Sequence, residues 1–281
     1  MPAILIDGQP DAQISPWDRG FQYGDGIFET IAVIQGEPLF WAAHFERLSR
    51  CARELALPEF PEKVWLEDIQ ALLRPDLPRQ VMKLLLSRGP GDRGYAFTGL
   101  EAGTRVVYAT DWPTFPRSHW QEGIVVGLCE TPLIGGAPFT RCKTLNRLNQ
   151  IVARQELNSR SGLSEGLMLD HAGMLREGTF TNLFWVREGR VETPKLDVAG
   201  ITGIMRQEII RWLTERQIPV FELDASPAIL AEATECFISN SLIGIWPVSS
   251  VEGVVNFSAN RPLSDQILSW LETISLVEKA E

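Results

Sequence analysis

Two hydrophobic patterns alternate along the first part of the chain, one with the period of a strand and one with the period of a helix. Apolar residues dominate Ala3–Asp7 and Ile27–Ile34, and a Gln-Gly turn followed by a short apolar return predicts a hairpin after the second segment. From Trp41 the apolar residues recur every three or four positions, which predicts a helix that ends before Pro58. A second helix is predicted over Val64–Leu73.

The rest of the chain continues this mixture. Further strands are predicted over Val81–Ser87, Thr104–Thr110, Ile124–Glu130, Gly166–Asp170, Asn182–Val186, Arg190–Thr193, Val220–Glu222 and Glu235–Ser239. Further helices are predicted over Thr144–Ser159, Gly203–Glu215 and Leu263–Ile274, together with a short helix that has Ser226 as its N-cap and Pro227 at its first position. The Pro- and Trp-containing stretch after residue 110 has no period, and we interpret 113–122 as a linker between domains 1–112 and 123–281.

Composition and charge narrow the class of protein. The 281 residues are 44% hydrophobic and 22% charged, which is typical of a globular protein. A net charge of −10 argues against a nucleic-acid partner, and the N-terminus and the hydrophobic runs predict neither a signal peptide nor a membrane span. We therefore expect a cytoplasmic protein with a small-molecule substrate. The four cysteines lie far apart in the sequence, so we expect reduced thiols and no metal site.

Three separated groups in the second half suggest a cofactor. Lys143 offers an amine, Glu177 a carboxylate, and Gly200–Gly203 a run of backbone N–H groups at the start of a predicted helix. Pyridoxal 5′-phosphate (PLP) needs a lysine for its Schiff base, an acid for its pyridine nitrogen and N–H donors for its phosphate. The three groups together predict PLP as the cofactor.

Each residue also has an ordinary interpretation. Lys143 could be a solvated lysine at a strand-to-helix junction, and Glu177 a turn carboxylate in a loop between the strands that end at Asp170 and begin at Asn182. Arg47 lies off the apolar stripe of its helix, so from the sequence alone we interpret it as solvent-facing.

A glycine-rich segment formally matches a dinucleotide-binding fingerprint. Gly89-Pro-Gly-Asp-Arg-Gly94 follows a predicted strand, but the fingerprint requires a long helix directly after it. Only a short stretch broken by Gly99 and Gly103 separates it from the next strand. We therefore interpret it as a hairpin or active-site loop.

Beyond these single residues, the motifs resemble a known family. Lys143, followed by Glu-Gly-x-x-x-Asn-Leu-Phe from Glu177 and then Gly-Ile-Thr before a helix, is similar to the class IV aminotransferases, the fold-type IV PLP enzymes. The opening segment Asp18–Thr30 and His44-Phe45-Glu46-Arg47-Leu48 resemble further motifs of that family, and the similarity covers nearly the whole chain. The resemblance implies an α/β (α+β) fold of two domains. These are an N-terminal open sheet with helices and a C-terminal barrel-like sheet with helices, with the cofactor between them, in a homodimer whose partner can complete the site.

The resemblance also implies roles for individual residues. Lys143 corresponds to the Schiff-base lysine and Glu177 to the partner of the pyridinium nitrogen. The phosphate contacts correspond to Arg47, Ile201, Thr202 and Ser241, with a weaker claim for Asn240.

Within the family, this chain departs from the transaminases. Phe28 and Leu148 stand where D-amino-acid and branched-chain transaminases, respectively, have tyrosines. Ser87–Tyr95, Lys143–Gln150 and Gly203–Arg206 are similar instead to the family's lyases, which convert 4-amino-4-deoxychorismate into p-aminobenzoate and pyruvate. That substrate has two carboxylates.

For those carboxylates, the candidate partners are Arg93, Tyr95 and Thr30, although Arg93 could also be an ordinary loop arginine. Two alternatives remain, a D-amino-acid or branched-chain transaminase of the same family and a cofactor-free binding relative.

Overall fold

The computed structural model describes residues 3–136 and 141–278, which form two compact units. Unit 1 comprises Met1–Pro113 and Cys142–Asn146, and unit 2 comprises Thr114–Arg141 and Arg147–Glu281. Among the described residues, no helix has both the length and the apolar composition that crossing a membrane requires.

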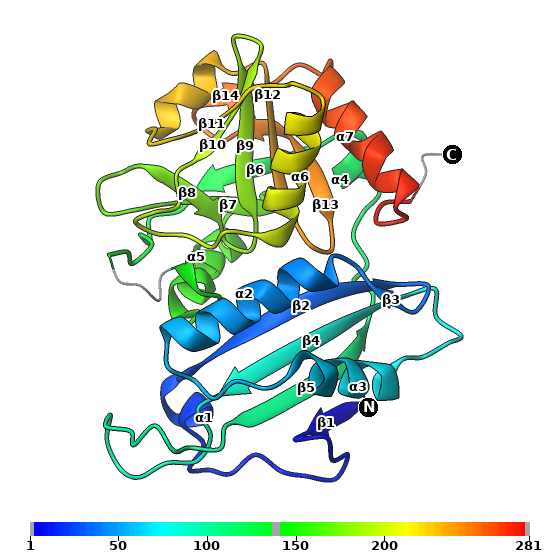
Figure 1. Cartoon of the computed structure of the whole chain (residues 1–281). Helices are drawn as coiled ribbons and strands as arrows, with labels where there is room; N and C mark the ends of the chain where they lie inside the picture. Colours follow the sequence, from blue (N-terminus) through cyan, green and yellow to red (C-terminus); the bar gives the residue numbers. More distant parts are fainter. Residues whose placement is uncertain (1–2, 137–140, 279–281) are drawn as a thin grey trace. The chain divides into compact units, whose positions relative to one another are not determined.

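Unit 1 is built on a five-stranded antiparallel sheet in the order β1-β5-β4-β2-β3. Its strands are β1 (Ile4–Ile6), β2 (Gly26–Ile34), β3 (Glu37–Pro38), β4 (Arg79–Ser87) and β5 (Thr104–Asp111). Its helices are α1 (Arg19–Tyr23), α2 (Trp41–Glu54) and α3 (Glu62–Leu72). Figure 1 shows α2 and α3 against one face of the sheet, where α2 packs on β2 and α3 on β5.

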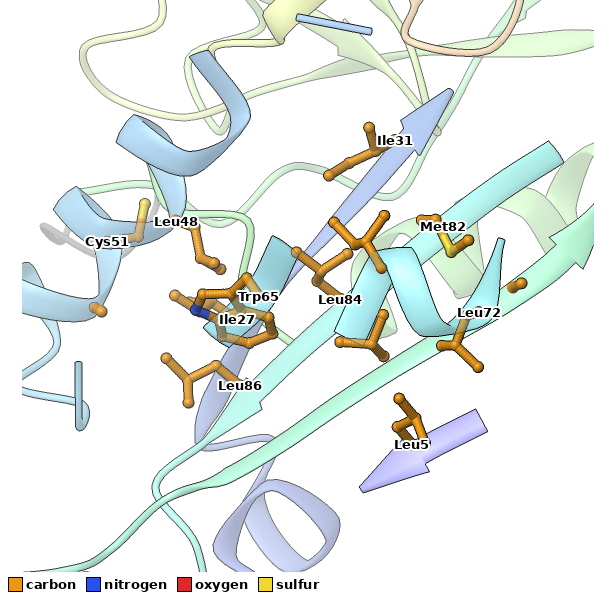
Figure 2. Close-up of a cluster of buried hydrophobic side chains, with 14 of the residues drawn as sticks. Leu5, Ile27, Ile31, Leu48, Cys51, Trp65, Leu72, Met82, Leu84 and Leu86 are labelled. Carbon is orange, nitrogen blue, oxygen red and sulfur yellow. The ribbon is translucent and has the colours of Figure 1, made fainter. Parts of the chain in front are cut away.

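The core of unit 1 lies between that face and the two helices. Because side chains alternate along a strand, Ile27 and Ile31 of β2 both point toward the helices, and each is at most 1% exposed. Leu48 and Cys51 of α2 and Trp65 of α3 fill the same cluster, as Figure 2 shows. The side chains of the residues between Ile27 and Ile31 therefore point alternately toward this core and toward the opposite face of the sheet.

Unit 2 contains a nine-stranded sheet that curls into a half-barrel, in the order β11-β10-β9-β12-β13-β6-β7-β8, with β14 paired to β13. Its strands are β6 (Ile124–Leu128), β7 (Glu165–Leu169), β8 (Leu175–Gly178), β9 (Asn182–Arg187), β10 (Arg190–Pro194), β11 (Val220–Leu223), β12 (Glu235–Asn240), β13 (Gly244–Val251) and β14 (Val255–Asn256). Its helices are α4 (Ser118–Gln121), α5 (Leu148–Asn158), α6 (Ile204–Glu215), α7 (Pro262–Thr273) and the 3₁₀ helix η2 (Pro227–Glu232). Helix α5 packs on β7, α6 on β12, and α7 on β12 and β13 (Figure 1).

The expected mixed α/β class is confirmed, but one helix start is wrong. The helix predicted from Thr144 begins only at Leu148. The residues before it extend the unit 1 sheet instead: Thr144 lies opposite Ile27, and the N–H of Leu145 donates to the carbonyl oxygen of Gly26 at 2.9 Å. The partner strand lies far earlier in the chain, so the local pattern around residue 144 could not reveal this pairing.

The segment interpreted as a linker is also structured. It carries α4, and the rings of Phe115 and Trp120 pack against Trp246 of β13, with centroids 4.8 Å and 5.8 Å away. A four-residue helix is too short to show a hydrophobic period, so it could not be predicted from the sequence. The predicted domain boundaries stay a prediction.

Besides α4, four elements were not predicted: α1, β8, β13 and β14. Strand β13 contains Pro247, a residue that argues against a strand when only the sequence is considered. The rejection of the dinucleotide fingerprint is confirmed, because Gly89–Gly94 connects two antiparallel neighbours, β4 and β5, with no helix between them.

Candidate active site

Lys143 lies on the short extended segment that widens the unit 1 sheet beside β2. The N–H of Phe28 donates to the carbonyl oxygen of Lys143 at 2.9 Å, which sets the two residues opposite each other and on the same face. The Lys143 Nζ lies 4.5 Å from the centroid of the Phe28 ring, and the Nζ of Lys83, from β4, lies 4.9 Å from it. Since Ile27 points toward the helices, both amines lie on the face away from α2 and α3.

Arg47 is held in a buried ionic cluster of unit 1. Its Nε and Nη2 donate to the two oxygens of Glu29 at 2.7 Å and 2.5 Å, and the Nδ1 of His44 lies 2.7 Å from Glu29 Oε2. Arg47 is only 5% exposed, so its interpretation as solvent-facing is wrong. The sequence signal was present in β2, where Glu29 occupies an inward position between Ile27 and Ile31, a place for a carboxylate only if it is paired.

The cluster is electrostatically matched. Burial raises the pKa of Glu29, but the charge of Arg47 and the hydrogen bonds from His44 and Arg47 outweigh burial and lower that pKa to about 2. Burial lowers the pKa of His44, against the hydrogen bond to Glu29 that raises it. Glu29 is therefore ionised across the physiological range, and it orients two of the five N–H groups of the Arg47 guanidinium.

Replacing Glu29 with glutamine is expected to destabilise unit 1 most at neutral pH. The folded-state pKa of Glu29 lies below its ordinary value of 4.5, so its stabilising effect is complete above about pH 4.5 and is lost as the pH falls toward 2. The free energy of unfolding should therefore differ between parent and Glu29→Gln by roughly 3 kcal/mol at pH 7. This difference should shrink in urea unfolding at pH 3. An equal difference at both pH values would contradict the assignment, and Glu46→Gln, at an exposed position of α2, is the control.

Glu177 lies in unit 2 and is part of a strand. The loop expected between Asp170 and Asn182 is wrong at this position: β8 is four residues long, and all of its residues are buried. The strand was not predicted because its sequence, Leu-Arg-Glu-Gly, contains two charged residues. Both charged side chains are buried because each is paired with a partner. Arg176 bonds Asp170 at 2.6 Å, and Glu177 Oε2 accepts the N–H of Ile201 at 2.7 Å.

The segment that precedes α6 is therefore bound directly to Glu177. Gly200 has φ +100°, and a Cβ there would meet Leu196 at 2.7 Å and Glu177 Oε2 at 3.4 Å, so only glycine allows this close approach. From β9, the Asn182 amide donates to the Ile201 carbonyl oxygen at 2.8 Å and accepts the N–H of Gly203 at 3.1 Å. The predicted motif contained Asn182, but its anchoring role was missed because it requires the register of β9.

Ser241 follows β12 directly, and β12 pairs with β9 so that Ser239 lies opposite Asn182. The end of β12 is therefore adjacent to the end of the strand that anchors the start of α6. Gly203 has no side chain to cap the helix, and the first turn of α6 has no acidic residue. The N–H groups of Ile201 and Gly203 already donate to Glu177 and Asn182, so a phosphate at this end would meet the N–H groups of the first turn of α6, which carries no acidic residue.

The predicted substrate residues divide into two places in unit 1. Thr30 lies on β2 opposite Lys83, on the same face as Phe28. Arg93 and Tyr95 are exposed and lie in the loop between β4 and β5. The Tyr95 ring packs edge-on against Tyr23 at 5.4 Å.

Two buried arginines fix that loop. The guanidinium of Arg19 donates to the carbonyl oxygens of Gly94, Tyr95 and Ala96 at 2.9–3.2 Å. Arg88 lies over the ring of Phe97 at 3.9 Å. Asp25 accepts hydrogen bonds from both arginines, at 2.9 Å and 2.8 Å. The opening segment Asp18–Thr30 therefore stabilises the loop between β4 and β5, a role that the sequence did not indicate.

Three observations indicate that the polar groups of these residues are suited to bind PLP. Unit 1 presents the Lys143 amine beside an aromatic ring, and the buried Nε2 of His44 has no hydrogen-bond partner among the residues that the structure describes. Unit 2 presents a buried carboxylate, Glu177, bonded to the backbone at the start of a helix. These groups can supply an amine, an acceptor for a protonated ring nitrogen, and N–H donors for a phosphate.

Comparisons with known proteins agree with this chemistry. The sequence model of the family Amino-transferase class IV matches residues 26–251. The aminodeoxychorismate lyase of Vibrio harveyi is 31% identical over 258 residues, which cover 89% of this chain and 92% of that protein. A D-alanine aminotransferase of Staphylococcus epidermidis is 26% identical over 263 residues, 90% of each chain.

The fold is similar to a solved structure over nearly its full length. The crystal structure of 4-amino-4-deoxychorismate lyase from Pseudomonas aeruginosa superposes with a TM-score of 0.89 at 36% identity, covering 96% of this chain and 98% of that one. The resemblance inferred from the motifs is therefore confirmed, and so are the mixed α+β fold and the PLP chemistry expected from it. The chain belongs to the class IV aminotransferases, a family of PLP-dependent enzymes.

Proposed function

We propose that this protein is a PLP-dependent lyase that converts 4-amino-4-deoxychorismate into p-aminobenzoate and pyruvate. The observation that carries the proposal is the 36% identity and near-complete superposition with the Pseudomonas aeruginosa lyase. Phe28 supports it from the sequence side. Two lysine amines lie over its ring, at the position where a D-amino-acid transaminase would present a tyrosine hydroxyl.

Distinct side chains bind the different parts of PLP in this proposal. Lys143 holds the cofactor through its amine, Glu177 accepts the N–H of the ring nitrogen, and the phosphate is bound by Thr202, Ser241 and Arg47 together with the Ile201 backbone. When bound, PLP supplies an electron-accepting ring next to the carbon that bears the substrate amine. A carboxylate beside the ring nitrogen keeps that nitrogen protonated, because a nearby negative charge favours the charged form of a base.

Lys143 performs both proton transfers in the proposed reaction. The substrate amine takes the place of Lys143 on the cofactor, and the freed, neutral Lys143 amine would then remove the proton from the amine-bearing carbon of the substrate. The ether bond to the enolpyruvyl group then breaks, the ring becomes aromatic, and the Lys143 ammonium returns a proton to the departing group, which leaves as pyruvate. Atoms balance without a further reactant. Because aromatisation makes the step strongly downhill, the main task of the protein is to orient the amine and the substrate.

The two substrate carboxylates are assigned to Arg93, Tyr95 and Thr30. A guanidinium binds a carboxylate with two parallel hydrogen bonds, and the hydroxyls of the other two residues donate one each. The Arg19 contacts to the loop carbonyl oxygens support this assignment, because they hold the backbone around Arg93 and Tyr95 in one conformation. Organised loops lose less entropy when a ligand binds.

A transaminase is the second candidate. It is supported by the relatives named as aminotransferases, among them the D-alanine aminotransferase at 26% identity. In that case Lys143 would return the proton to the cofactor instead of assisting elimination. The residues proposed to bind PLP would be the same, so only the substrate separates the two candidates.

A two-arm assay tests the proposal. The purified protein with PLP is mixed with 4-amino-4-deoxychorismate, and p-aminobenzoate fluorescence is followed; a parallel sample receives 2-oxoglutarate and a panel of D- and branched-chain amino acids. We expect rapid p-aminobenzoate release and slow or absent amino transfer. Enzyme-like amino transfer without p-aminobenzoate would establish the transaminase instead. No reaction in either arm, together with no bound PLP, would favour a cofactor-free binding protein.

The proposal includes a homodimer, as the family resemblance implies, and a cytoplasmic location. Sedimentation equilibrium should give twice the 31.5 kDa chain mass. A monomer that is fully active would refute the idea that a partner completes the site.

A further inference from the structure

A second buried carboxylate of unit 2 lies outside the groups assigned to the proposed reaction. Glu165, the first residue of β7, is 0% exposed. Its Oε1 accepts the N–H of Gly166 at 2.7 Å, the N–H of Thr179 at 3.0 Å and the hydroxyl of Thr179 at 2.5 Å. The hydroxyl of Thr181 donates to Oε2 at 3.4 Å. Three of these four bonds therefore come from the short connection between β8 and β9.

That connection joins two residues that bind the segment before α6. The turn Gly178–Thr181 follows Glu177 and precedes Asn182, between β8 and β9 of Figure 1. Glu177 accepts the N–H of Ile201 at 2.7 Å, and the Asn182 amide donates to the carbonyl oxygen of the same residue at 2.8 Å. A displacement of the turn would therefore move both side chains that hold Ile201.

The turn packs closely against the carboxyl group. The N–H of Gly178 donates to the carbonyl oxygen of Thr181 at 2.7 Å, which closes the turn. A Cβ at Gly178 would overlap the Thr181 hydroxyl and would lie 3.2 Å from the Cδ of Glu165. Only glycine therefore allows the backbone after Glu177 to approach Glu165 this closely.

Hydrogen bonds, more than ionic attraction, hold Glu165 and the turn together. Burial raises the pKa of Glu165, and the hydrogen bonds from Thr179 and Gly166 oppose that effect without outweighing it. The Nη1 of Arg154 lies 3.9 Å from Glu165 Oε1, and the Arg154 side chain is 42% exposed, so water weakens this attraction. An uncharged acceptor of the same shape should therefore hold the turn nearly as well.

We propose that Glu165 is a positioning residue: its carboxyl group holds the turn Gly178–Thr181 and so sets the orientation of Glu177 toward the ring nitrogen of PLP. This inference rests on the proposed function, because it assumes that Glu177 is the partner of that nitrogen. Glu165 itself is assigned no contact with cofactor or substrate. Such a residue can still control the rate, because a misplacement of about 1 Å that originates away from the chemistry can slow a reaction about a hundredfold.

Two substitutions separate the hydrogen bonds of Glu165 from its charge. Glu165→Gln keeps an acceptor oxygen for the turn and loses the charge, whereas Glu165→Ala removes the acceptor. The matched control is Glu235→Ala. Glu235 is 5% exposed, belongs to the same unit and likewise accepts two backbone N–H groups and one hydroxyl, from Leu263 and Ser264 at the start of α7.

The first readout uses the cofactor-free protein. Hydrogen exchange followed by mass spectrometry reports on the peptide that contains Ile201, whose N–H is bonded to Glu177. Exchange at Ile201 should be about tenfold faster in Glu165→Ala than in the parent, because its acceptor is no longer held in place. Glu165→Gln and Glu235→Ala should stay within about twofold of the parent.

The second readout uses the protein with PLP bound. Glu165→Ala should lower kcat about tenfold with KM within about twofold, and it should alter the absorbance spectrum of the cofactor in the same direction as Glu177→Gln. Glu165→Gln should keep the parental spectrum and a kcat within about threefold of the parent, and Glu235→Ala should lower Tm without changing the spectrum.

A second pair of variants decides the matter if Glu165→Ala does not fold. Thr179→Val removes the hydroxyl that donates to Glu165 at 2.5 Å, whereas Thr179→Ser keeps a hydroxyl. Only Thr179→Val should then show the faster exchange and the altered spectrum. Equal behaviour of the two Thr179 variants would contradict the proposal.

Other outcomes also overturn the proposal. Unchanged Ile201 exchange in Glu165→Ala would show that the carboxyl group does not hold Glu177 in place. Faster exchange with the parental spectrum and kcat would show that the bonds are structural only, and the same spectral change in Glu235→Ala would assign the effect to lost stability. Failure of the proposed function is recognised separately, because the parent would then release no p-aminobenzoate, whatever the exchange result.

Discussion

Replacing Lys143 with alanine is expected to lower kcat for p-aminobenzoate formation on the order of 10⁴-fold. The proposed reaction uses this one amine to hold the cofactor, to remove a proton and to return one, and a positioned acid–base group alone contributes roughly 10²- to 10⁴-fold. The measurement is the single-turnover rate with PLP in excess. Borohydride reduction followed by peptide mapping should place the cofactor on Lys143 in the parent and nowhere in the variant.

Lys83 provides a matched control for this experiment. Its amine lies over the same Phe28 ring, at 4.9 Å against 4.5 Å for Lys143, so it shares the aromatic environment, but its backbone belongs to β4 and not to the short segment that contains Lys143. Lys83→Ala should therefore retain the covalent link at Lys143 and most of the activity. A cofactor found on Lys83, or a Lys143→Ala variant with parental activity, would rule out the assignment.

Replacing Glu177 with glutamine is expected to give the second-largest effect, a loss of about 10²- to 10³-fold in kcat. Glutamine has nearly the same shape, and its oxygen can still accept the Ile201 N–H that Glu177 accepts at 2.7 Å. What it loses is the negative charge that favours a protonated ring nitrogen. The covalent link at Lys143 should persist, so that binding and electron withdrawal are separated.

The control for Glu177 is a second buried carboxylate of unit 2. Glu192 is 0% exposed and bonds Trp185 and Arg187 at the β9–β10 pair. Glu192→Gln should reduce stability without altering the absorbance spectrum of bound PLP, whereas Glu177→Gln should alter the spectrum. If Glu177→Gln kept both the parental spectrum and the parental kcat, the pyridinium partner would have to be another residue.

Much of the fold could be predicted from local pattern. Strands such as Ile27–Ile34 and helices such as the one beginning at Trp41 were identified because burial on one side imposes a period of two or of 3.6 residues. Elements shorter than about two periods, such as α4 and β8, do not show such a signal. Residues 144–146 were wrongly assigned to a helix, because their extended conformation depends on pairing with β2.

The candidate site could likewise be predicted only in part. The family and the cofactor PLP followed from the residue types and their order along the chain: Arg47, Lys143, Glu177 and then Gly200 to Thr202. The environments of these residues could not be predicted. Arg47 appeared solvent-facing because a helical stripe reports only the apolar side of a helix, whereas Glu29 from a separate strand makes its burial favourable.

The sequence by itself determined the chemistry that this protein can offer, because functional groups are a property of residue type and survive any rearrangement of the backbone. Only the tertiary structure decided how those groups are held: Glu177 in a strand and bonded to Ile201, Arg47 ionically paired, and Lys143 anchored by a backbone hydrogen bond from Phe28. The physical reason is range. Periodicity and turn chemistry act over a few residues, whereas hydrogen bonds and ion pairs join segments that only folding brings into contact.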